Sequence, residues 1–388
     1  MNFSNRIPAD LSANAVAGAI EAAQTRKILD LTESNPTRCA FDYPPGLLDG
    51  LGETEAYQYH PNPLGDPNAR EALSDFLNAR GQKTRPQNII LTSGTSEAYS
   101  FLFKLFGNPG DSFLTPTPGY PLLDHLLALE GLTAQPYSLK TEADWPLDLE
   151  EISSLHDPKI KGFISINPHN PTGAFLSPGD QDQMARLCRQ NNWMVISDEV
   201  FQDYGYAVER PQPWIPAGVL SFRLGGLSKS LALPQLKLSW MVLEGPEELV
   251  RPCVERLELI ADSYLSVGGP VQHILPRLLL SAPNIQKQIR ERLFENRKNL
   301  SGKLNGIENV QLWPSQGGWY ALIEKLGGGV SDDQMVLELL AQKNLLVHPG
   351  VFYDFPAERK FLVLSLLPPT DLFDEGTTLI QKYLKALH

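Results

Sequence analysis

Short apolar runs of strand length recur along the middle of the chain, separated by longer stretches in which apolar residues follow a helical spacing. Seven runs are expected to form strands: Asn88–Thr92, Ser112–Thr115, Thr133–Leu139, Lys161–Ile166, Trp193–Ser197, Ser221–Leu224 and Leu238–Leu243. Because strands and helices alternate wherever a connection is long, the pattern predicts an α/β fold with a mainly parallel sheet of about seven strands between helices.

The two ends of the chain follow a different pattern. Residues 11–26 place apolar side chains on one side of an expected helix, and residues 28–31 read as a short strand. Residues 271–304 are strongly helical, and residues 305–388 alternate between strands and helices. The C-terminal part is therefore predicted to form a smaller α+β lobe.

The composition is that of an ordinary soluble globular protein, with 42% hydrophobic and 20% charged residues. The formal net charge is −12 and Lys/Arg-rich runs are absent, which argues against nucleic acid or a membrane surface as a partner. The three cysteines lie far apart without metal-ligand spacing, so we expect reduced thiols, no metal site and a cytoplasmic location. We also expect no cleaved signal and no membrane-spanning helix.

Candidate chemistry centres on Lys229, within the stretch Leu224–Trp240. Leucines surround this lysine in sequence, and burial disfavours an ammonium ion, which lowers the pKa of the amine. An amine of this kind can form a Schiff base with a carbonyl group. A lysine whose head reaches solvent past an apolar loop is the ordinary structural alternative.

Three other motifs lie at the ends of expected strands. Ser93–Ser96 opens a helix, where free N–H groups favour an anion, although such a string is also typical of helix capping. Asn167–Gly173 (Asn-Pro-His-Asn-Pro-Thr-Gly) is a proline-locked turn at the carboxyl end of a strand, where α/β sheets build their sites. Asp198 ends an apolar strand, where its charge is costly without a compensating cation, unless it simply caps a helix.

Together these motifs resemble the class I/II aminotransferases, which are fold-type I pyridoxal-phosphate enzymes, and the resemblance covers nearly the whole chain from about residue 28. It implies a large cofactor-binding domain over residues 51–285 and a C-terminal small domain over residues 286–388. The N-terminal segment, residues 1–50, would be part of the small domain. The implied reaction moves an amino group between an amino acid, or a related amine, and a 2-oxo acid in a ping-pong mechanism.

The resemblance also assigns roles to individual residues. Lys229 would form the aldimine with pyridoxal 5′-phosphate and carry the proton during transfer, and Asp198 would face the pyridinium nitrogen. Asn170 would donate to the phenolic oxygen, and Tyr120 would stack on the ring. The expected phosphate ligands are Gly94, Thr95, Ser96, Ser228 and Lys237, together with Tyr59 from a neighbouring subunit, which implies a homodimer.

Four positions depart from the family pattern. Phe201 replaces a tyrosine that hydrogen-bonds the phenolic oxygen, which should raise the pKa of the Schiff base. Gly226 replaces a serine that contacts the phosphate, and Ser228 is the candidate substitute. Lys237 replaces an arginine, so it offers a point charge in place of a planar fork.

The fourth departure concerns the substrate. Val363 occupies the position of the arginine that binds the substrate carboxylate in the family, and arginine is the natural clamp for that group. Either another cation serves, or the substrate is not an ordinary α-amino acid. Arg38, in the proline-rich N-terminal loop, is the candidate replacement, and a solvated loop charge is the alternative reading of this residue.

Two further functions stay open on the sequence. Phe201 and Val363 motivate a lyase, decarboxylase or oxidase of the same fold, and a binding protein without cofactor is a different class altogether. A nicotinamide enzyme is not supported, because no GxGxxG string follows an expected strand.

Overall fold

The structure is a computed structural model that describes residues 3–12, 14–23, 26–142, 144–207 and 212–387. Its larger sheet has seven strands in the order β2-β8-β7-β6-β5-β3-β4. These strands are β2 (Ile89–Thr92), β3 (Ser112–Thr117), β4 (Thr133–Ser138), β5 (Ile160–Ile166), β6 (Met194–Asp198), β7 (Ser221–Gly226) and β8 (Ser239–Glu244). Only β8 runs against its neighbours, so the expected mainly parallel sheet is confirmed.

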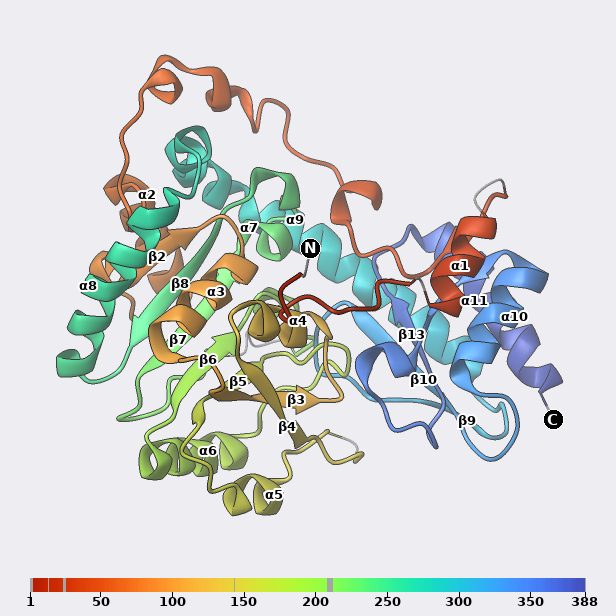
Figure 1. Ribbon diagram of the computed structural model, residues 1–388. Helices are drawn as coiled ribbons and strands as arrows, with labels where there is room; N and C mark the ends of the chain where they lie inside the picture. The colour runs from red at the N-terminus through yellow and green to blue at the C-terminus, as the bar shows by residue number, and fades with distance from the viewer. Residues whose placement is uncertain (1–2, 13, 24–25, 143, 208–211, 388) are drawn as a thin grey trace.

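Helices cover both faces of this sheet (Figure 1). One face packs on α3 (Thr95–Phe106), α4 (Leu122–Leu129) and α8 (Glu247–Tyr264) through one continuous apolar cluster. The other face packs on α2 (Pro67–Asn78), α6 (Pro178–Asn191) and α9 (Gly269–Leu304), with α5 (Leu149–Ser154) beside α6. The short helix α7 (Leu227–Ser230) follows β7 directly. This arrangement is doubly wound, as the alternation of strands and helices predicted.

A four-stranded antiparallel sheet in the order β12-β13-β10-β9 forms the core of a second lobe. Its strands are β9 (Val310–Leu312), β10 (Tyr320–Lys325), β12 (His348–Pro349) and β13 (Phe361–Ser365). The helices α10 (Asp332–Lys343) and α11 (Thr370–Ala386) belong to the same part of the chain, and Figure 1 shows both beside this sheet.

The N-terminal segment joins this second lobe. β1 (Leu29–Asp30) pairs in parallel with β11 (Leu345–Leu346), and α1 (Ala15–Ala22) packs on α10. The helix expected over residues 11–26 begins later, because the Asn14 side chain accepts a hydrogen bond from the N–H of Ala17 at 2.8 Å and caps the helix there. The domain limits at residues 50 and 285 stay predictions.

The long helix α9 runs between the lobes, packing on α2 in one and on α11 in the other (Figure 1). Asn296 of α9 also holds the segment just before α11, since its Nδ2 donates to the carbonyl oxygens of Leu366 and Pro368, at 2.9 Å each. No helix in the described ranges is long and apolar enough to cross a bilayer.

Candidate active site

A cavity of about 210 Å³ opens at the carboxyl ends of β5 and β6, facing the second lobe. Its walls come from the N-terminal loop, the start of α3, the loops after β3 and β5, the end of β6, α7 and β10. The lining residues are Ser34, Thr95, Ser96, Tyr99, Tyr120, Leu122, Leu123, Ile166, Asn170, Asp198, Val200, Phe201, Lys229 and Tyr320. Carboxyl ends of parallel strands are where α/β sheets place ligands.

The main chain that carries Lys229 is held tightly against the sheet. A Cβ atom on Gly226 would come within 2.3 Å of the Ser239 hydroxyl, so glycine lets β7 approach β8 just before α7. Tyr204 donates its hydroxyl to the carbonyl oxygen of Lys229 at 2.7 Å. The residue before α7 is therefore glycine for a packing reason, which accounts for the missing serine at this position.

The amine of Lys229 lies among aromatic rings and not in solvent. Its Nζ is 4.9 Å from the ring centroid of Trp319 and 5.5 Å from that of Phe201. Burial lowers the pKa of the amine to about 8, and the charge of Asp198 opposes this shift. A much larger fraction of this amine is unprotonated near neutral pH than is usual for a lysine, as a nucleophilic amine requires.

Asp198 occupies the same cavity at the end of β6. Its Oδ2 accepts a hydrogen bond from the hydroxyl of Tyr99 at 3.0 Å, and its Oδ1 accepts one from the N–H of Val200 at 3.2 Å. Burial raises the pKa of the carboxyl to about 6, while these two hydrogen bonds and the Lys229 charge act in the opposite direction. The carboxylate thus has hydrogen bonds and the Lys229 charge nearby but forms no ion pair with a described residue, and it can accept a cationic ligand group.

The N-terminus of α3 is free to receive an anion. No side chain caps it, so the capping expected as an alternative for Ser93–Ser96 is not observed. A Cβ atom on Gly94 would meet no atom within 4 Å, so open space adjoins this backbone. Thr95 and Ser96 line the cavity beside it. Uncapped N–H groups at the positive end of a helix dipole suit a phosphate.

Asn170 and Tyr120 line the same cavity from the segments that follow β5 and β3. The Oδ1 atom of Asn170 is buried and has no hydrogen-bond partner among the described residues. A buried amide atom without a partner calls for one from a ligand or water. Tyr120 is 46% exposed, and its loop is anchored where the N–H of Gly119 donates to the carbonyl of Tyr353 at 2.8 Å.

Five of the predicted site residues do not line this cavity: Gly94, which adjoins it at the start of α3, and the four residues that follow. Ser228 is half-buried in α7, and Lys237 is exposed at the end of the loop that follows it. Tyr59 is 75% exposed and lines a separate hollow formed with the start of α9. The side chain of Arg38 is 75% exposed and lies 3.6 Å from Glu33, which is the geometry of a solvated loop charge.

Sequence reasoning missed three polar residues of the cavity: Ser34, Tyr99 and Tyr320. Tyr99 follows Thr95 by one helical turn, so the helical period alone could have placed it on the same face. Ser34 and Tyr320 carry no comparable signal, because a loop and a strand from opposite ends of the chain meet here only in the folded protein.

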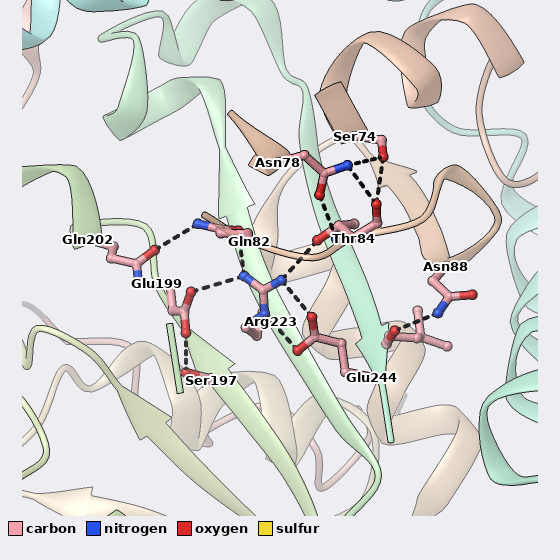
Figure 2. Close-up of polar contacts among 11 residues, drawn as sticks. Ser74, Asn78, Gln82, Thr84, Asn88, Ser197, Glu199, Gln202, Arg223 and Glu244 are labelled. Carbon is pink, nitrogen blue, oxygen red and sulfur yellow. Dashed lines mark hydrogen bonds and ion pairs between the residues drawn. The ribbon is translucent and has the colours of Figure 1, made fainter. Parts of the chain in front are cut away.

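A second polar cluster joins β7 and β8 to Glu199, just after β6, and to the segment after α2 (Figure 2). Arg223 is only 3% exposed and binds Glu244 through two hydrogen bonds of 2.9 and 3.0 Å. The same guanidinium donates to Gln82 at 2.7 Å and to Thr84 at 3.2 Å, and it lies 3.5 Å from Glu199. Nothing in the sequence pointed to this cluster, which ties β7, the strand that leads into α7 and Lys229, to β8 and to the residue that follows Asp198.

Comparison with known proteins gives a consistent result. The family model for aminotransferase class I and II matches residues 10–365. The glutamate-pyruvate aminotransferase AlaA of Escherichia coli K12 is 29% identical over 371 residues, which cover 93% of this chain and 91% of that protein. An alanine aminotransferase of Mycobacterium tuberculosis is 27% identical over 361 residues, covering 90% and 84%.

Solved structures agree with these sequence relatives. The crystal structure of an aminotransferase from E. coli is 26% identical, with a TM-score of 0.88 over 100% of this chain and 99% of that one. An alanine aminotransferase from Pyrococcus furiosus superimposes with a TM-score of 0.89 at 24% identity, over 99% and 100% of the two chains, which bears on the fold alone.

Proposed function

Because the chain belongs to the class I and II aminotransferase family and is an aminotransferase, we propose that it holds pyridoxal 5′-phosphate at Lys229. We propose further that it moves an amino group between an amino acid, or a related amine, and a 2-oxo acid. The observation that carries this proposal is the presence in one cavity of an amine with a lowered pKa and a buried carboxylate, Asp198. The family match does not favour a lyase, decarboxylase or oxidase.

The residues present fit this cofactor. The carboxylate of Asp198 suits a protonated ring nitrogen, and the Nδ2 group of Asn170, whose side chain lines the same cavity, would donate to a ring oxygen. The open, uncapped N-terminus of α3, with Gly94, Thr95 and Ser96, suits a phosphate. Tyr120 would pack over the ring.

The roles proposed from the resemblance for Ser228 and Lys237 at the phosphate, and for Tyr59 across a subunit boundary, need rearrangement or a second chain. The exposed ring of Tyr59 in its separate hollow supports a contact with another copy. We therefore propose a homodimer, and the three buried free thiols support a cytoplasmic location.

When bound, the cofactor supplies an electron sink for the charge left when a proton leaves the reacting carbon. The chain contributes the groups that handle that proton and that charge. Lys229, largely unprotonated above its pKa of about 8, accepts the proton and returns it at a neighbouring atom. Asp198 holds the proton on the ring nitrogen through its negative charge. Trp319 and Phe201, packed near the amine, exclude water from it. Both substrates would enter this one cavity in turn, which is a ping-pong order.

Trapping at Lys229 tests the proposal. The protein is incubated with pyridoxal phosphate, reduced with borohydride and digested, and the peptide masses are measured by mass spectrometry. The Lys229 peptide should carry the reduced adduct, K229A should carry none there, and the exposed Lys237→Ala variant should keep it. In a separate sample of holoenzyme that has not been reduced, an amino donor supplied without acceptor should convert the cofactor to pyridoxamine phosphate. An unmodified Lys229 peptide would contradict the proposal.

A further inference from the structure

The cavity offers a substrate carboxylate no fixed positive charge. Among the described residues that line it, Lys229 is the one cation, and its amine is committed to the cofactor in the proposed function. The one acidic group is Asp198. A carboxylate that enters this space therefore finds a carboxylate and hydroxyl groups but no guanidinium.

Two arginines of the neighbouring segments, Arg38 and Arg292, are bonded elsewhere. Arg38 lies beside Glu33 on the surface. Arg292 of α9 donates to the carbonyl oxygens of Cys39 and Leu367, at 3.2 and 3.0 Å, and its guanidinium lies 5.0 Å from the ring of Phe41. Releasing Arg292 would leave both carbonyls unpaired, so it is a poor candidate for a mobile clamp.

The strand that carries Val363 is apolar at this position. Val363 is 1% exposed, and its register neighbours in the small sheet are Leu322 and His348. The His348 ring is held by the hydroxyl of Tyr353 at 3.1 Å, and burial lowers the pKa of this histidine below its usual value. His348 is therefore neutral at pH 7 and does not substitute for the missing guanidinium.

Hydroxyl groups face the cavity from the second lobe and the N-terminal loop. Tyr320 of β10 and Ser34 both line it, and burial raises the pKa of Tyr320 to about 12, so its hydroxyl stays protonated at neutral pH. Leu122, Leu123 and Val200 are apolar parts of the lining, and most of its other polar residues are those proposed above to hold the cofactor. Such a wall binds a neutral polar group through hydrogen bonds, whereas an unpaired carboxylate loses its hydration there without compensation.

We propose that the amino substrate bound best carries a neutral polar group, a hydroxyl or an amide, where an α-amino acid carries its carboxylate. This rests on the proposed function, whose site it deepens, and it makes Tyr320 and Ser34 specificity-determining residues. The substrate class is then amino alcohols or amino amides, and the 2-oxo acid is the more weakly held of the two substrates.

The test separates recognition from turnover. The holoenzyme is titrated, with the cofactor absorbance as readout, against 2-amino-2-methylpropan-1-ol, 2-methylalaninamide and 2-methylalanine. These three compounds have no proton on the reacting carbon, so they bind without being turned over. Each Kd is corrected for the pKa of the free amine. We expect the alcohol and the amide to bind at least about tenfold more tightly than the acid.

Variants assign the effect to the named groups. Tyr320→Phe and Ser34→Ala should weaken the alcohol several-fold and leave the acid unchanged, with an unchanged Tm showing that the fold is intact. Arg38→Ala should leave the ratio of the two dissociation constants unchanged. If Arg38 does enter the cavity, the acid binds as tightly as the alcohol and Arg38→Ala weakens it, and the proposal is overturned.

Rates give an independent reading with donors that can react. L-alanine and (S)-2-aminopropan-1-ol are compared for conversion of the cofactor in the absence of acceptor, and the alcohol should react at least about tenfold faster at low concentration. If L-alanine reacts faster, the inference on substrate class falls while the proposed aminotransferase function stands. If neither donor converts a cofactor that is bound to Lys229, transamination falls, and the binding ratio still decides the inference.

Discussion

Replacing Arg223 by methionine removes the cation around which the buried cluster of β7 and β8 is built (Figure 2). Glu244 loses two hydrogen bonds of 2.9 and 3.0 Å, and Glu199 loses an ion-pair contact of 3.5 Å. Removing one partner of a buried ion pair costs about 3–5 kcal/mol, because the remaining charge stays buried without compensation. The shift in Tm is this free-energy loss divided by the unfolding entropy, which is about 2.1 cal/mol/K per residue. For a chain of 388 residues the expected loss in Tm is therefore about 4–6 °C.

The loss should depend on pH with a definite sign. Burial raises the pKa of Glu199 to about 7, and Arg223 opposes this rise. Without Arg223 the folded-state pKa rises further, so the folded protein binds the proton over a wider pH range than the unfolded chain does. Stability that depends on this proton is lost as pH rises, so the Tm deficit of the variant is largest at about pH 8.5 and smaller at about pH 6.

Scanning calorimetry of the wild type and R223M at both pH values measures this effect. Arg85 supplies the matched control, because its 2.6 Å ion pair with Glu247 lies on the surface and R85A should cost less than about 1 kcal/mol. Glu244→Gln in the R223M background should recover part of the loss, since an amide needs no countercharge. The reasoning is refuted if R223M loses no more Tm than R85A, or if its deficit grows towards acidic pH.

Three further predictions follow from single groups. The rate at which the apoenzyme captures pyridoxal phosphate at Lys229 should rise with pH and level off above the amine pKa of about 8, and a rise that continues to pH 10 would show an ordinary lysine. Tyr99→Phe removes a hydrogen bond that lowers the pKa of Asp198, so the carboxylate of the variant should become protonated at a higher pH. As the solution is acidified, the affinity for the cofactor should therefore begin to fall at a higher pH than in the wild type. The same pH dependence in both proteins would disprove this role. Gly173 has a φ of +71°, and a Cβ atom there would lie 2.3 Å from a carbonyl oxygen, so Gly173→Ala should lower the free energy of unfolding by about 2–4 kcal/mol in chemical denaturation. Gly18→Ala is the control: a Cβ atom there meets nothing within 4 Å, so the variant should stabilise α1 by about 0.5–1 kcal/mol.

Much of the fold was predictable because its signals are local. Most strands of the large sheet are short apolar runs, and a proline-rich turn such as Asn167–Gly173 is readable from neighbouring residues. Lys229 and Asp198 could be picked out by the same logic, since a charged residue beside an apolar run is costly unless it has a use. The helix over residues 11–26 was drawn too long because apolar spacing does not reveal where a side chain such as Asn14 caps.

The rest of the site could not be read in this way. Tyr99 reaches Asp198 across 99 positions of the chain, and Arg223 gathers partners from β8 and from the segment after α2. Arg38 was a reasonable candidate by residue type, yet the loop that carries it turns its side chain towards Glu33 and solvent. Which side chains share a cavity depends on segments that pack together far apart in sequence.

The sequence by itself determined the elements, their order and the identity of the reactive groups, because local patterns of apolar, proline and glycine residues suffice for these. Only the tertiary structure decided which charges are paired, which pKa values shift and what faces the substrate. Strand order contributes to the difference: in the large sheet β2 lies beside β8 and β3 lies beside β5, and the strands of these two pairs are not consecutive in the chain. Burial and electrostatic compensation are properties of that packing.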